Sequence, residues 1–179
     1  LPVFSVEWQI AVGGGTLDRF LDFSLFKMAE LAPNWDDTFI ATSDLASHGS
    51  ADDLRTYVKL VRWHFKMPPP FSNREMLYLV VPTMLGAGED TMCLINYVSV
   101  SSPRYPCDKG YVRAFNTVPS FDLAKETSDG IEVRHLMTTR IGGWVSDALL
   151  WNPFFKGPVI KNNGEEGRKV RDMLAKELS

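Results

Sequence analysis

Apolar and polar residues alternate near the start of the chain and then recur at helical spacing. Val6–Val12 alternates with period two, which predicts a strand with one buried face. Three glycines at 13–15 end that strand. Thr16 then offers an N-cap, and apolar residues from Leu17 to Met28 recur every three or four positions. We therefore expect an amphipathic helix that ends near Leu31, before Pro33.

The middle of the chain has the alternation of a sheet. Residues 42–53 are rich in Ser, Asp, Gly and Ala, which is typical of connecting turns. Five strands are predicted after them, at about 61–67, 75–81, 92–100, 111–118 and 131–140. Prolines 68–70 cannot donate to a sheet ladder, so they separate the first two of these strands. The short connections between the strands favour an antiparallel meander.

The C-terminal part returns to helical spacing. An apolar patch at 144–150 precedes Asn152-Pro153 and Gly157-Pro158, and a last helix is predicted from about Glu165. The fold class is therefore α+β, with a curved antiparallel sheet whose apolar face the helices must cover. The pattern leaves two alternatives open for the space between sheet and helices, namely packed side chains or a ligand cavity.

Composition and charge narrow the classes of function. The 179 residues suit one domain, and the formal charge of −3 provides no basic surface for nucleic acid. No apolar run approaches the ~20 residues of a membrane span, and Cys93 and Cys107 are expected to be free thiols in a reducing compartment. We therefore expect a cytoplasmic, monomeric protein that contacts membranes only peripherally. Leu1 leaves a targeting segment upstream open.

The chain carries no recognisable catalytic motif. His48, His64 and His135 have no metal-ligand spacing, and Gly13–Thr16 lacks the lysine and the glycine spacing of a phosphate-binding turn. No GxSxG elbow is present, and neither cysteine lies in a nucleophile motif. We therefore expect no catalytic residue, no metal and no cofactor.

His135 is predicted on the inward face of its strand. It shares that face with Ile131, Val133 and Met137. One interpretation is a core histidine whose hydrogen bonds are satisfied by a neighbour. The other is a polar anchor in a lipid or small-molecule cavity, where one hydrogen bond fixes the orientation of the ligand.

Four segments in register resemble the START lipid-transfer domains of the Bet v 1-like helix-grip superfamily. They are "NWDDTF" (34–39), "RWHFKMPPPFSNREMLYL" (62–79), "GYVRAF" (110–115) and "RIGGWVSDAL" (140–149). The resemblance covers about Leu17 to Leu178. Ser146 stands where the family usually has proline, and the family's N-terminal helix and first two strands have no counterpart here. Two explanations stay open for that difference, a divergent short form and missing pieces upstream.

The resemblance implies a helix-grip fold over 1–179, in which the sheet curls around a long C-terminal helix and encloses a tunnel. It further implies one bound lipid that is carried between membranes without being chemically changed. The Gly86–Asp90 hairpin and the segment from Trp144 to Leu178 correspond to the family's gating elements. The alternative is an enzyme or sensor on the same fold, of the polyketide cyclase or hydrolase kind, with His135 as acid or base.

Departures from the family decide what is expected of the ligand. Ala32 replaces an arginine that pairs with phosphate in phosphatidylcholine binders, Met76 replaces a cage tyrosine, and Val80 replaces the buried arginine of sterol binders. A sterol, a phospholipid held differently and a fatty acyl ligand all remain open. The predicted lipid-binding residues are Trp63, Phe65, Met76, Tyr78, Val80, Val133, His135, Met137, Trp144 and Leu149.

Aromatic residues in "WNPFF" (151–155) allow two interpretations. They pack inward, or some of them, such as Trp151 and Phe154, form an edge that touches the membrane.

Overall fold

The computed structural model describes residues 4–50, 52–116, 118–140, 142 and 153–178, with the backbone alone for 4–8, 89, 153–164 and 166. Its strands are β1 (Phe4–Gly13), β2 (Phe39–His48), β3 (Val58–Phe65), β4 (Asn73–Leu85), β5 (Met92–Ser99), β6 (Tyr111–Arg113), β7 (Ser120–Thr127) and β8 (Gly130–Thr139). Its longer helical elements are α1 (Leu17–Asp22), α2 (Met28–Leu31) and α4 (Pro153–Leu178), and a π-helical turn (Phe23–Lys27) joins α1 to α2. Short 3₁₀ turns lie at Ala32–Asn34 and Gly88–Asp90.

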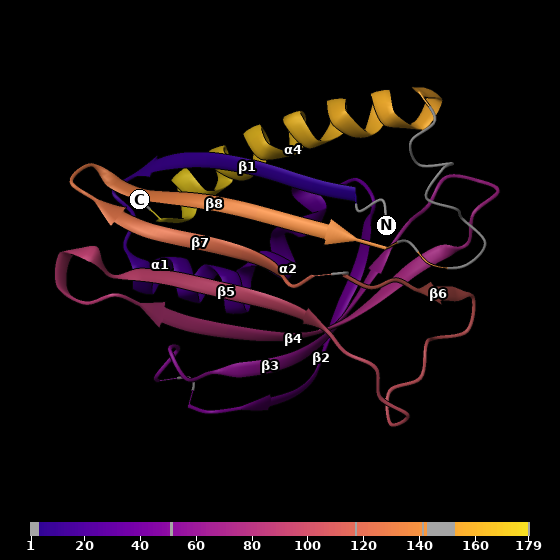
Figure 1. The fold of residues 1–179 in the computed structure, drawn as a ribbon, viewed down its shortest axis with the longest axis horizontal. Coiled ribbons are helices and arrows are strands. Elements are labelled where there is room, and N and C mark those ends of the chain that lie inside the picture. Colours follow the sequence, from indigo (N-terminus) through magenta and orange to yellow (C-terminus); the bar gives the residue numbers. More distant parts are fainter. Residues whose placement is uncertain (1–3, 51, 117, 141, 143–152, 179) are drawn as a thin grey trace.

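The strands form one sheet in the order β1-β8-β7-β5-β4-β3-β2. Every neighbouring pair in this order is antiparallel. Figure 1 shows the sheet curving around α1 and α2, with α4 lying along β1. The predicted α+β class, with a curved antiparallel sheet against N-terminal and C-terminal helices, is confirmed.

The prediction of one strand at 111–118 was wrong. The segment contains the short β6, which runs parallel to β4, and Phe115 then bridges to Arg140. A separate strand, β7, follows from Ser120 and was not predicted. Its buried positions are Ser120, Asp122 and Ala124, whereas Phe121 is only half-buried. The larger apolar side chains therefore face away from the core, which is the reverse of the usual pattern.

Residues 42–48 are also strand rather than turn. They belong to β2, which lies at an edge of the sheet beside β3. Most of its side chains are exposed, and the pairing register shifts at Phe39/Ala41 and again at Asp44/Ala46. An exposed and bulged edge strand has no apolar alternation, so its sequence resembles a loop.

The N-terminal helix was predicted at the observed residues. Thr16 caps it, since its Oγ1 accepts a hydrogen bond from the Arg19 amide at 3.3 Å. The C-terminal helix, in contrast, begins at Pro153 rather than near Glu165. Proline suits a first helical turn because the amide hydrogens there have no partner within the helix. Pro158 removes one backbone hydrogen bond, and the 26-residue helix continues through it.

The hydrophobic core lies on the concave face of the sheet. Residues from the N-terminal helix, the sheet and the end of α4 contribute to it. Its fully buried members include Leu21, Leu25, Val61, Ile95, Ile131 and Leu174. A cavity lies beside the helices, and it is the candidate site.

Candidate functional site

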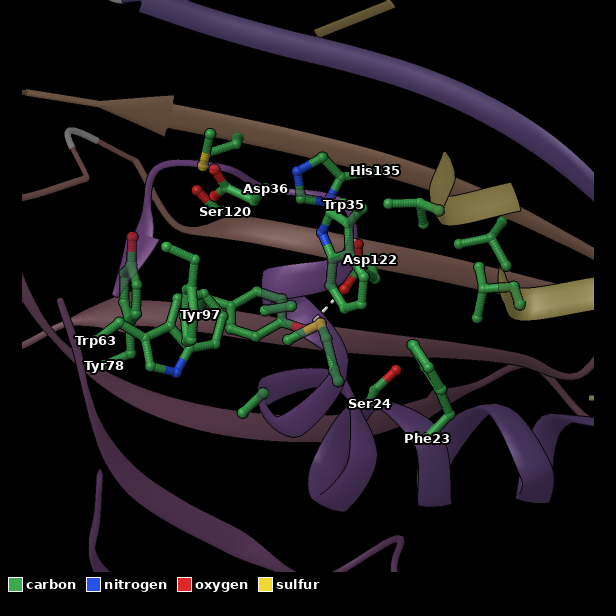
Figure 2. Close-up of a pocket in the computed structure, with 18 of the residues that line it drawn as sticks. Phe23, Ser24, Trp35, Asp36, Trp63, Tyr78, Tyr97, Ser120, Asp122 and His135 are labelled. Atoms are coloured by element: carbon green, nitrogen blue, oxygen red, sulfur yellow. Dashed lines mark hydrogen bonds and ion pairs between the residues drawn. The ribbon is translucent and has the colours of Figure 1, made fainter. Parts of the chain in front are cut away.

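A cavity of about 160 Å³ lies between the concave face of the sheet and the helices (Figure 2). Most of the side chains around it are apolar or aromatic. The helical side contributes Phe20, Phe23, Ser24, Met28, Ala29, Ala32, Trp35, Asp36, Val170 and Leu174. The strands contribute Phe39, Trp63, Phe65, Tyr78, Tyr97, Ser120, Asp122, Val133, His135 and Met137.

One wall of the cavity is aromatic. Trp63 on β3, Tyr78 on β4 and Tyr97 on β5 come from neighbouring strands. The ring centroid of Trp63 lies 5.2 Å from that of Tyr78 and 5.7 Å from that of Tyr97. Burial raises the pKa of Tyr78, so its hydroxyl keeps its proton, and it donates to Asn116 Oδ1 at 3.0 Å. Three packed aromatic rings therefore form this wall.

A buried polar cluster of Tyr97, Asp122 and His135 forms a second part of the wall. Asp122 and His135 are paired residues on β7 and β8. Asp122 Oδ1 lies 2.6 Å from His135 Nδ1, and Asp122 Oδ2 accepts a 2.7 Å hydrogen bond from the Tyr97 hydroxyl. Burial, reinforced by the charge of Asp122, raises the pKa of Tyr97 well above its usual value. Tyr97 therefore remains a hydrogen-bond donor.

The structure satisfies the His135 ring through a neighbour and also places it at the cavity, while its role as an anchor for a ligand stays a prediction. The ring is satisfied by a neighbour, Asp122, as expected of a core histidine. It also lines the cavity, as expected of a polar anchor, and Figure 2 shows it beside the space above Asp122.

Ser24 reaches the cavity because the N-terminal helix widens into a π-helical turn. That turn includes Phe23, Ser24 and Leu25, all of them buried. Ser24 is 4% exposed, and it lines the cavity. π-Helical turns inside helices are frequent at functional sites. The Ser24 side chain can therefore contact a molecule bound in the cavity.

Asp36 lies at the edge of the cavity and stabilises a turn. Its Oδ1 accepts hydrogen bonds from the amide of Thr38 at 2.8 Å and from the hydroxyl of Thr38 at 2.6 Å. These bonds stabilise the turn that precedes β2. Arg74 serves the fold as well, since its guanidinium donates to the carbonyl oxygens of Ser72 and Gly142.

Six of the predicted lipid-binding residues line the cavity, namely Trp63, Phe65, Tyr78, Val133, His135 and Met137. Met76 and Val80 are buried in the core, and neither is among the described lining residues. Trp144, Leu149 and Trp151 lie outside the described residues, as does the side chain of Phe154. The role of all these residues in lipid binding stays a prediction, as does the role of Gly86–Asp90 as a gate.

Sequence reasoning placed His135 and Tyr78 at the cavity but missed several of its other polar residues. Asp122 and Ser120 belong to the strand that was not predicted, so their inward orientation was hidden. Ser24 lies inside a predicted helix, where a single serine gives no signal. Tyr97 lies on a predicted strand, and its alternation with Ile95 and Cys93 was the available signal.

A second polar cluster lies at the junction of β3, β4 and β6 and does not line the cavity. The Glu75 side chain is fully buried, with Oε1 2.6 Å from Arg113 Nη2 and Oε2 3.2 Å from His64 Nε2. Arg62 Nη1 lies 2.6 Å from Asp108 Oδ1. His64, Glu75 and Asp108 lie close enough to share a cation, but Arg62 and Arg113 already supply positive charge to the two carboxylates. We interpret this cluster as an ion-pair network that serves the fold.

Within the described parts of the chain, no helix combines the length and the apolar character needed to cross a bilayer.

Comparison with known proteins relates this fold to lipid-transfer domains. No family sequence model and no curated protein sequence matches the chain. Three similar solved structures are human STARD10 (18% identity, TM-score 0.62), the lipid transfer and protein localization domain of human StarD13 (17%, 0.67) and a fragment of a STAR-related lipid transfer protein from Xanthomonas axonopodis (18%, 0.64). The matches cover 96%, 100% and 97% of this chain, and 66%, 79% and 86% of the respective structures. The chain therefore has the fold of the START domains.

Proposed function

We propose that this protein binds one lipid molecule in its internal cavity and carries it between membranes without chemical change. The ligand is a sterol, a phospholipid or a fatty acyl compound. The protein acts as a monomer in the cytoplasm and contacts membranes only transiently.

The apolar cavity is the observation that supports this proposal most. It is lined from both the sheet and the helices, as a lipid carrier requires, and its aromatic wall and apolar helical side can bury a hydrocarbon chain. Each CH₂ group moved from water into such a site contributes about 0.8 kcal/mol to the free energy of binding. Lipid-transfer domains also share the fold. Binding and transporting a lipid without a chemical reaction is then the simplest function for this site.

The cavity is small for its proposed ligand. Its volume of about 160 Å³ is below the roughly 300–1,000 Å³ of typical small-molecule sites. A whole lipid therefore requires the helices to move away from the sheet. Such opening also provides the entry path, since lipid exchange at a membrane requires the cavity to be accessible.

The experiment combines native mass spectrometry with a vesicle transfer assay. The purified chain is incubated with vesicles containing sterol, phosphatidylcholine and fatty acid and is then separated from them. Native mass spectrometry measures the mass of the protein together with any bound lipid. We expect one lipid per chain and accelerated transfer between donor and acceptor vesicles.

A cavity-filling variant tests where the lipid binds. Ala29 lines the cavity on α2, whereas Ala46 is exposed on the edge strand β2. Ala29→Trp should abolish both binding and transfer, and Ala46→Trp should leave both unchanged. A wild-type chain that takes up no lipid, or an Ala29→Trp variant that transfers normally, would contradict the proposal.

The Asp122–His135 pair favours a second candidate, an enzyme on the same fold. A carboxylate bound to Nδ1 holds a histidine in the orientation of a general base. In this case a lipid ester or polyketide-like substrate would be turned over, and His135→Gln would abolish product formation while leaving binding intact. Recovery of every tested ligand unchanged argues for the carrier.

A further inference from the structure

Building on the proposed lipid-binding function, we propose that the buried polar end of the ligand is an uncharged hydroxyl group, held between Asp122 on the sheet and Ser24 on the helix. The protein would then select lipid alcohols and reject lipids that place a phosphate or carboxylate in this cavity. The chemistry of the lining residues supports this selection in three ways.

The first support is the charge of the lining. The described residues around the cavity include two carboxylates, Asp36 and Asp122, and among them there is neither lysine nor arginine. Asp122 is 6% exposed, and the hydrogen bonds that it accepts come from Tyr97 and His135. A buried anion requires a cation or several donors close by. A ligand phosphate or carboxylate would instead meet the negative charge of Asp122.

The second support is the hydrogen-bonding capacity left at the site. An ionised carboxylate offers about four lone-pair sites. Tyr97 and His135 occupy two of those of Asp122, so at least one site remains for a donor on the ligand. A hydroxyl group supplies such a donor.

The third support is Ser24, which complements Asp122. Ser24 is 4% exposed, and it lines the cavity. Figure 2 shows Ser24 on the helix that faces the strand carrying Asp122. A ligand alcohol donates its proton to Asp122 and accepts a hydrogen bond from Ser24, so one group satisfies both residues. An ammonium group would suit Asp122 but offers no acceptor to Ser24.

The test compares three probes that share one chain length and differ only at the polar end. Binding of 1-decanol, decanoate and decylamine to the intact protein is measured at pH 8 by tryptophan fluorescence and calorimetry. We expect decanol to bind at least about tenfold more tightly than either charged probe. Tighter or equal binding of decanoate or decylamine overturns the inference and leaves the carrier function standing. Failure of all three probes to bind overturns both.

Variants then assign the selection to the two residues. Asp122→Asn should reduce the discrimination against decanoate at least about tenfold, while Asp129→Asn, an exposed carboxylate of β-turn 127–130, should not change it. Ser24→Ala should weaken decanol binding about fivefold and leave decanoate unaffected, with Ser43→Ala on the exposed edge strand as control. Melting curves establish that each variant folds. Should Asp122→Asn fail to fold, Ser24→Ala decides alone, and unchanged decanol affinity in that variant contradicts the inference.

Discussion

Replacing Glu75 with glutamine should destabilise the protein strongly, although the two side chains have nearly the same shape. Glu75 is fully buried, and its carboxylate faces two arginines, Arg113 at 2.6 Å and Arg62 at 3.7 Å. It also accepts a hydrogen bond from the Asp108 amide at 2.8 Å. Glutamine can preserve that last bond through its amide oxygen, so the substitution mainly removes charge.

The expected magnitude follows from what the substitution leaves behind. The side chains of Arg62 and Arg113 are only 14% and 13% exposed, so water cannot replace the lost carboxylate. Removing one partner of a buried pair costs about 3–5 kcal/mol in unfolding free energy. That is a large part of the roughly 5–15 kcal/mol that stabilises a typical domain.

Urea unfolding, followed by tryptophan fluorescence and far-UV circular dichroism, measures this loss. We expect a lower midpoint with an unchanged slope. The control is Asp90→Asn, because Asp90 is 88% exposed in its pair with Lys125 and such surface pairs contribute about 0–1 kcal/mol. The double variant Glu75→Met/Arg113→Met should lose less unfolding free energy than the single variants Glu75→Met and Arg113→Met lose together. The reason is that the double variant removes both buried charges and leaves neither unpaired. A Glu75→Gln loss below about 1 kcal/mol would refute the reasoning.

Three further predictions concern the two cysteines, a turn glycine and a core leucine. Burial raises the pKa of the Cys93 thiol to about 12, and partial desolvation also raises the pKa of the Cys107 thiol, which lies in an exposed residue. Iodoacetamide at pH 8.5 should therefore alkylate Cys107 slowly and Cys93 only after the protein unfolds, and intact-mass measurements would show both rates. Gly130→Ala should cost at least about 1–3 kcal/mol by urea denaturation, because Gly130 has a φ of +145° and a Cβ there would lie 2.1 Å from the Val12 carbonyl oxygen. Leu174→Ala should cost about 2–5 kcal/mol, because Leu174 is 1% exposed, and normal stability would show that this end of α4 does not pack as described.

Most of the fold could be predicted because its strands obey the usual alternation. On β3, Val61 and Trp63 face inward, while Arg62 and His64 join the ion-pair network on the other face. The elements that could not be predicted break this rule for a physical reason. β2 is an exposed edge, and β7 turns its polar and small residues inward.

Apart from His135 and Tyr78, the candidate site was predictable only as far as it is apolar. Aromatic and aliphatic residues on inward strand faces, such as Trp63 and Val133, do line the cavity. Asp122 could not be deduced as a cavity residue, because its position depends on its pairing with His135 across two strands and on the Tyr97 hydroxyl from a third. Such a cluster forms only after the sheet is assembled.

The two polar clusters are connected through the alternation of β4. The Glu75 side chain belongs to the ion-pair network. Tyr78, three residues further along β4, lies on the opposite face of the strand and lines the cavity. A slip of one residue between β3 and β4 would exchange these faces, placing Glu75 beside the apolar wall and removing Tyr78 from it. The pairing of Glu75 with Arg62 and His64 on β3 opposes that slip, since another register would separate the buried carboxylate from both of these side chains. The network thus stabilises the arrangement of aromatic side chains at the cavity, although it does not line the cavity itself.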